Sequence, residues 1–197
     1  MSTASEVAVS AGNASAGGVR APTIKGIFVN SHIQLVRKVR GEVGVKELEA
    51  RMGMPLRFRV TDDVPVRDEV RLIEHALDLT SDAPFIGKAR AFEAGRLHFR
   101  NFSTTPWAKV LFTLFPRNFR FMTMHAKTVA ERVFNGVRFH SEDLGGNTVR
   151  VTMENADYPI EHFRGLFQEW MNFFEYDGVV DARTIGPRHF QYTMHWL

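Results

Sequence analysis

The fold class follows from residues 136–153, which read GVRFHSEDLGGNTVRVTM. Apolar and polar residues alternate on both sides of the glycine turn at 145–147, as they do in strands that bury one face. Two short alternating segments around such a turn predict a β-hairpin. The same pattern recurs over 179–196, around the Gly-Pro pair at 186–187, and predicts a second hairpin.

The segment between the two hairpins is typical of a buried helix. Tyr158-Pro159 precedes residues 160–176, in which apolar side chains occupy much of the helix circumference. We expect this helix to pack on a sheet that contains all four strands. Earlier in the chain, apolar residues recur at helical spacing. Helices are predicted over 24–40, 45–52, 64–79, 85–102, 107–115 and 118–134.

This order of elements predicts an α+β protein. An N-terminal helical bundle is followed by hairpin–helix–hairpin, which forms a small antiparallel sheet packed on a helix. A single α+β domain is expected over 23–197, and residues 1–22, rich in Ala, Ser and Gly, are expected to form a flexible tail. Gly87 and Gly95 lie inside the predicted helix at 85–102, where each costs about 1 kcal/mol against alanine, so they indicate close helix packing.

The composition excludes several classes of protein. Without cysteine, the chain has no disulfides, thiolate metal sites or cysteine nucleophiles. A formal charge of +3 is too small to indicate a nucleic-acid partner. The phosphate-loop, dinucleotide, zincin and nucleophile-elbow motifs are absent. With neither a secretory signal nor an apolar window of about 18 residues, we expect a cytoplasmic protein without a transmembrane segment.

Phenylalanine is the unusual component, with 17 residues against three Tyr and three Trp. The excess is concentrated in 107–121 and 163–174. Aromatic and methionine side chains favour ligand pockets, although they also fill ordinary cores. The pocket hypothesis places two helices opposite each other and uses Arg120, Phe121, Met124, His125, Phe167, Trp170 and Phe174. His125 or Arg120 would orient a polar group of the ligand.

Several scattered motifs carry a resemblance to known proteins. Lys25-Gly26-Ile27-Phe28-Val29-Asn30-Ser31, Gly87-Lys88-Ala89-Arg90 and the ending from Tyr158-Pro159 to Trp196 resemble the bacterial family called domain of unknown function 2378, over about 23–197. The ending is also similar to the 4-vinyl-reductase-type small-molecule-binding domain and to the sensor domain that binds heme and nitric oxide or oxygen. The resemblance implies a compact α+β domain with a ligand cavity between helices and sheet.

The heme-binding sensor domain has an axial histidine on a helix, followed by a hairpin with a Tyr-x-Ser-x-Arg motif that holds the propionates. His125 occupies a comparable place in this chain. The stretch that corresponds to the motif reads Met153-Glu154-Asn155-Ala156-Asp157, which contains none of the three residues. An acid in place of the arginine would repel a propionate. Heme through His125 is therefore the less favoured reading, and the cofactor is left open.

We interpret the chain as a non-enzymatic sensory or signalling domain that binds a small apolar or amphipathic ligand. A protein partner or a homodimer is compatible with this role. The alternative is an interaction or scaffold protein whose core is filled. A third hypothesis is an enzyme that uses His125 or His162 with Glu161. No metal ligand is predicted, because His140, Glu142 and Asp143 precede a turn where solvated side chains are expected.

Overall fold

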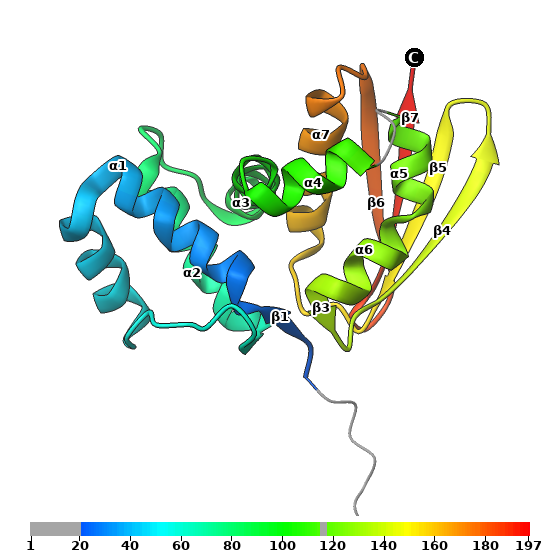
Figure 1. The fold of residues 1–197 in the computed structure, drawn as a ribbon. Coiled ribbons are helices and arrows are strands. Elements are labelled where there is room, and N and C mark those ends of the chain that lie inside the picture. Colours follow the sequence, from blue (N-terminus) through cyan, green and yellow to red (C-terminus); the bar gives the residue numbers. More distant parts are fainter. Residues whose placement is uncertain (1–20, 115–117) are drawn as a thin grey trace, which may run out of the picture.

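The computed structural model describes residues 21–114 and 118–197 (Figure 1). The predicted tail falls almost entirely outside these residues, as do Phe115, Pro116 and Arg117, and the domain boundaries stay a prediction. Its elements are β1 (Thr23–Lys25), α1 (Gly26–Met52), β2 (Asp63–Pro65), α2 (Val66–Thr80), α3 (Gly87–Ser103), α4 (Pro106–Leu114), α5 (Phe119–Met124), α6 (Ala126–Val133), β3 (Phe134–Asn135), β4 (Arg138–Gly145), β5 (Thr148–Glu154), α7 (Ile160–Phe173), β6 (Gly178–Gly186) and β7 (His189–Trp196).

The four C-terminal strands form one antiparallel sheet in the order β4-β5-β7-β6. Each predicted hairpin is present, and the second strands of the two hairpins pair at the centre of the sheet. Helix α7 connects the hairpins and packs on the sheet, mainly against β6. The predicted α+β class and the hairpin–helix–hairpin arrangement are therefore confirmed.

Only one face of this sheet is buried. Val149, Val151 and Met153 of β5 are completely buried, and Tyr192 and Met194 of β7 continue the same face. Intervening residues of both strands carry Thr, Arg, Gln and His side chains that reach solvent. The period-two alternation that predicted the strands thus separates a core face from a polar one.

Helix α1 contains the break that was predicted after residue 40. Gly41 has φ 66° and ψ −165°, which lie outside the helical region, whereas Gly44 is helical. A positive φ at this position suits glycine because it has no Cβ. The expectation of two helical segments is correct, and they are joined directly at a kink.

A second, three-stranded sheet was not predicted. Its order is β2-β1-β3, and Ile24 of β1 pairs with Val64 of β2 and Phe134 of β3. The predicted helix starts at 24 and 64 and the predicted helix end at 134 are wrong, because these residues are in strands. Each strand has two or three residues, too few for an alternating pattern, and the pairing joins distant parts of the sequence.

The helix predicted over 118–134 is two helices. It breaks at His125, whose φ of −98° and ψ of 9° are not helical, so α5 ends before this residue and α6 follows it. Asn118 caps α5 by accepting a hydrogen bond from the Phe121 backbone N–H at 3.0 Å. The break places His125 at the corner between two helices rather than inside one.

Helices α3 and α7 cross at two glycines. A Cβ on Gly95 of α3 would lie 1.7 Å from the His162 carbonyl oxygen, and a Cβ on Gly165 of α7 would lie 2.0 Å from the Phe92 carbonyl oxygen. The close packing expected at Gly95 is confirmed. Gly87 instead begins α3 with φ 54° and has open space around it.

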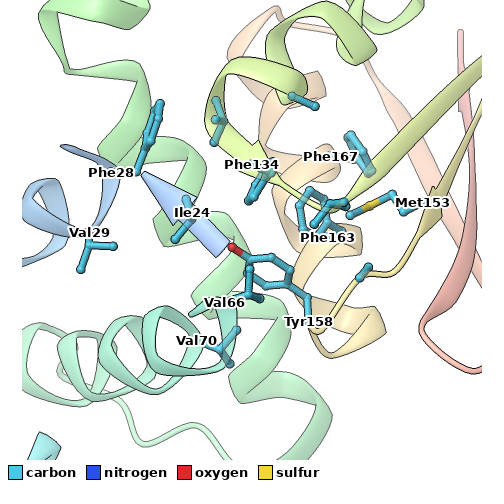
Figure 2. Packing of buried hydrophobic residues seen from close by; sticks show 14 of the residues in the cluster. Ile24, Phe28, Val29, Val66, Val70, Phe134, Met153, Tyr158, Phe163 and Phe167 are labelled. Atoms are coloured by element: carbon cyan, nitrogen blue, oxygen red, sulfur yellow. The ribbon is translucent and has the colours of Figure 1, made fainter. Parts of the chain in front are cut away.

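One hydrophobic core connects the N-terminal helices with the sheet. Figure 2 shows the ring of Tyr158, from the loop before α7, beside Ile24 and Val66, with Phe134 and Phe163 on the side of the sheet. In Figure 1, α3 and α7 lie between the α1–α2 pair and the strands. Among the described residues, the model contains no helix whose length and apolar character would allow it to cross a membrane.

Candidate functional site

An apolar pocket of about 110 Å³ lies between the helices and the sheet. Side chains from α1 and α3 to α7, together with β3 and β4, line it. Eight of its 18 lining residues are phenylalanines, which accounts for nearly half of the 17 in the chain. Among the described lining residues, the polar groups are the imidazoles of His98 and His125 and the indole N–H of Trp170, which is buried without a hydrogen-bond partner. The pocket therefore suits a small apolar molecule with at most one or two hydrogen-bonding groups.

Three of the residues proposed from sequence line this pocket: His125, Phe167 and Trp170. The others lie outside the lining. Arg120 forms an ion pair with Asp143 at 3.0 Å, and Phe121 is 37% exposed. Met124 and Phe174 pack against the hydrophobic core while partly exposed.

His125 lies at the pocket's edge, with its ring exposed and stacked on Phe121 at a centroid distance of 4.1 Å. Its Nδ1 lies 2.7 Å from the Phe121 carbonyl oxygen. Because a carbonyl can only accept, Nδ1 carries the proton and donates. This bond holds the imidazole at the corner between α5 and α6.

A second polar feature lies on the other side of His98. His32 of α1, Glu69 of α2, His98 of α3 and His162 of α7 are all buried and form one cluster. His32 Nε2 lies 2.9 Å from Glu69 Oε1, and His98 Nδ1 lies 3.5 Å from the same oxygen. His98 Nδ1 is also 3.1 Å from His162 Nε2. We call these four residues the histidine–glutamate cluster.

Regular helical packing brings the cluster together. His32 lies on the α1 face that also buries Phe28, Val29 and Val36. Glu69 lies on the apolar stripe of α2, three residues after Val66. The glycine crossing of α3 and α7 brings the backbone near His98 and His162 into contact, so their rings meet at a centroid distance of 5.4 Å.

Burial controls the charge of the cluster. It lowers the pKa of His98 to about 3 and that of His162 to about 4, so both imidazoles are neutral at pH 7. Burial alone would raise the pKa of Glu69, but the neighbouring imidazoles, His98 first, more than offset this and hold it at about 2. Glu69 is thus an ionised carboxylate in the interior.

Two buried oxygens of the cluster region lack well-formed hydrogen bonds. Glu69 Oε2 and the Tyr158 hydroxyl make no hydrogen bond of standard geometry to a described residue, although the hydroxyl lies close enough to the Glu69 carboxylate to interact with it. Burial, and next the Glu69 carboxylate, raise the pKa of Tyr158 well above its usual value, so the hydroxyl keeps its proton. The cluster therefore has unused coordination capacity, which is costly in an interior unless something else satisfies it.

Sequence reasoning missed this cluster. His162 was considered only as a base beside Glu161, but Glu161 pairs with Arg164 at 2.7 Å, and His162 faces His98. The available signal was a glutamate on the apolar stripe of α2, where a charged side chain is unusual. Glu142 and Asp143, expected to be solvated before the turn, are exposed and pair with Arg150 and Arg120, and the absence of a metal there stays a prediction.

Among the comparisons with known proteins, only the comparison of structures found similar proteins. No protein-family model and no curated protein matches it, so the resemblance to domain of unknown function 2378 stays a prediction. A point variant of the T. tengcongensis H-NOX domain superposes with a TM-score of 0.63 at 16% identity, covering 88% of this chain and 97% of that one. An oxygen-binding H-NOX domain related to soluble guanylate cyclases gives 0.63 at 16%, covering 88% and 95%.

A third H-NOX domain, from work on heme distortion in that family, gives a TM-score of 0.61 at 16% identity and covers 88% of this chain and 95% of its own. These superpositions span nearly all of both chains. The fold of this chain is that of H-NOX domains.

The residues of this chain do not fit a heme. A cavity of 150 Å³ accommodates benzene, and the pocket of about 110 Å³ is smaller, whereas a porphyrin is several times larger than benzene. The stretch in the place of the propionate-binding motif offers no cation. Met153 is completely buried, Asn155 donates to the Gly136 carbonyl, and Asp157 pairs with Arg188 at 3.4 Å.

Proposed function

We propose that this domain binds a small apolar molecule in the pocket and acts as a non-enzymatic sensory domain. The observation that supports the proposal is a pocket with 16 apolar lining residues and two imidazoles. A partly open, apolar hollow of this size between the helices and the sheet is unusual for a domain whose core is simply filled. It argues against a scaffold protein with a filled core. The H-NOX fold, which includes an oxygen-binding domain, supports a sensory role.

The ligand class follows from the size and chemistry of the pocket. Its volume restricts an occupant to about the size of benzene or smaller in this conformation. His98 and His125 place two imidazoles in the otherwise largely apolar wall. Small aromatic or aliphatic molecules and apolar gases meet these limits.

The pocket suits binding better than catalysis. His32 and Glu69 are within hydrogen-bond distance, as a base and its orienting acid would be, but both are completely enclosed. His125 opens on the pocket, and its Nδ1 partner is a backbone carbonyl. The geometry thus lacks a histidine–carboxylate pair that faces the pocket, among the residues described.

Benzene and xenon are suitable probes. A probe at 100 times its Kd stabilises the folded state by about 2.7 kcal/mol, which raises Tm by about 5–10 °C for a chain of this size. Ala126→Leu adds three carbons to a buried residue of the lining and should abolish the rise. Ala89→Leu, at an exposed position of α3, is the matched control and should keep it.

The outcome is read from Tm and from xenon density in a crystal. Xenon in the pocket of the unchanged protein, together with a benzene response that only Ala126→Leu loses, supports the proposal. Absence of both responses in the unchanged protein contradicts it. An equal response of the two variants shows that the probe binds elsewhere and also contradicts it.

A further inference from the structure

The histidine–glutamate cluster has the donor set of a transition-metal site. His32, Glu69 and His98 each offer one ligand atom, and these atoms all lie within 4.8 Å of one another. Imidazole nitrogens with a carboxylate suit Zn²⁺, Fe²⁺ and related divalent ions. Two histidines and one carboxylate are a known metal-binding combination that leaves coordination positions open. Ca²⁺ and Mg²⁺ prefer oxygen ligands and are disfavoured here.

The spacing of the donor atoms fits one central ion. Two ligand atoms at about 2.0–2.1 Å from a tetrahedral ion are about 3.3 Å apart. The distances to Glu69 Oε1 are 2.9 Å from His32 Nε2 and 3.5 Å from His98 Nδ1, which bracket this value. His162 Nε2 is 3.1 Å from His98 Nδ1 and borders the group of three.

The charge of the cluster also calls for a cation. Glu69 is completely buried, and its ion-pair partners among the described residues are His32 and His98, not a lysine or an arginine. A buried carboxylate without a compensating charge is strongly unfavourable. A bound divalent ion would compensate the charge and use the unpartnered Oε2.

The surroundings can orient a metal-bound His32. Asn101 Nδ2 lies 3.0 Å from His32 Nδ1 and 2.9 Å from Ser31 Oγ. Rotating the Asn101 amide by 180° would present its oxygen to Nδ1, which could then carry the proton and leave the Nε2 lone pair for the ion. Metal-ligating histidines are commonly held by such a bond from the second nitrogen. Asn101 would be a positioning residue.

We propose that His32, Glu69 and His98 bind one divalent transition-metal ion of the zinc type. This site is separate from the apolar pocket and does not depend on a ligand there. His98 belongs to both, so an ion bound here would fix one wall of the pocket.

Metal binding is tested on the full chain after treatment with EDTA and dialysis. Zn²⁺ is titrated by calorimetry, and Co²⁺ by its visible absorption, which reports nitrogen and oxygen coordination. We expect one ion per chain. Glu69→Gln keeps the shape of the side chain and removes its charge, and should weaken binding at least tenfold. His75→Asn is the matched control, because His75 lies outside the cluster and near Asp78; its affinity should not change.

Stability gives an independent readout of the same variant. Without metal, Glu69→Gln removes a buried carboxylate whose ion-pair partners among the described residues are histidines, and should unfold at a Tm equal to or above that of the unchanged protein. Zn²⁺ should raise the Tm of the unchanged protein and not that of the variant. If Glu69→Gln does not fold, Co²⁺ in the unchanged protein should broaden NMR signals around residues 32, 69 and 98. No binding, equal affinity in both proteins or broadening elsewhere would overturn the proposal.

Discussion

Gly95→Ala tests whether the glycine crossing holds α3 and α7 together. Helix propensity alone predicts that alanine stabilises α3 by about 1 kcal/mol. The structure predicts the opposite, because the new Cβ would lie 1.7 Å from the His162 carbonyl oxygen and 2.7 Å from its carbonyl carbon. Contact at an ordinary distance requires the two backbones to separate by more than 1 Å. The α3 and α7 backbones both lie in a well-packed region, so moving either of them disrupts other contacts.

The net magnitude follows from these two opposing effects. Overpacking costs about 1–3 kcal/mol even when flexible side chains absorb it, and here the obstacle is backbone. After subtraction of the gain in propensity, about 1 kcal/mol, from the upper end of this range, about 3 kcal/mol, we expect a loss of about 2 kcal/mol in unfolding free energy. Urea denaturation at pH 7, followed by circular dichroism, measures this loss.

A control on the same helix separates packing from propensity. Ala89 is exposed, so Ala89→Gly should cost only about 1 kcal/mol, the ordinary propensity difference. Gly165→Ala, whose Cβ would lie 2.0 Å from the Phe92 carbonyl oxygen, should behave like Gly95→Ala. If Gly95→Ala is as stable as the unchanged protein, the reasoning from the crossing is wrong.

Three further outcomes are expected. The unfolding free energy of the metal-free protein, measured by urea titration, should fall by about 3–4 kcal/mol between pH 7 and pH 5. His98 and His162 take up protons near pH 6.5 only in the unfolded state, because their pKa values in the folded state are about 3 and about 4. A stability that does not change with pH would contradict this. Phe119→Ala empties a completely buried position and should cost about 3–5 kcal/mol in the same assay, whereas a loss below 1 kcal/mol would be inconsistent with that burial. The purified protein should show no Soret band, and a strong one would refute the conclusion that heme does not fit.

The C-terminal sheet and its helix could be predicted from the sequence because their signals are local. Alternation over 136–153 and the glycine turn define one hairpin, and the same signals define the other. The small sheet was not readable, since Ile24 pairs with residues far away in the sequence and no local pattern reports that pairing.

Of the two candidate sites, the apolar pocket could be predicted in part from local sequence patterns and the histidine–glutamate cluster could not. Phe167 and Trp170 were identifiable because an aromatic helix next to a sheet tends to line whatever space lies there. The histidine–glutamate cluster draws one residue from each of four helices, so only the packing of those helices reveals it. A charged residue on an apolar helical stripe, such as Glu69, is the local sign that a search for such clusters could use.

The three-stranded sheet constrains how the chain folds during synthesis. β1 is the central strand of that sheet, and Ile24 is completely buried there. Its pairing with β2 can form early, but its other edge stays open until Phe134 has left the ribosome. Closing so long a segment carries an entropic cost and slows folding. A nascent chain stalled before residue 134 should therefore expose the free edge of β1, where chaperones that recognise extended segments would bind.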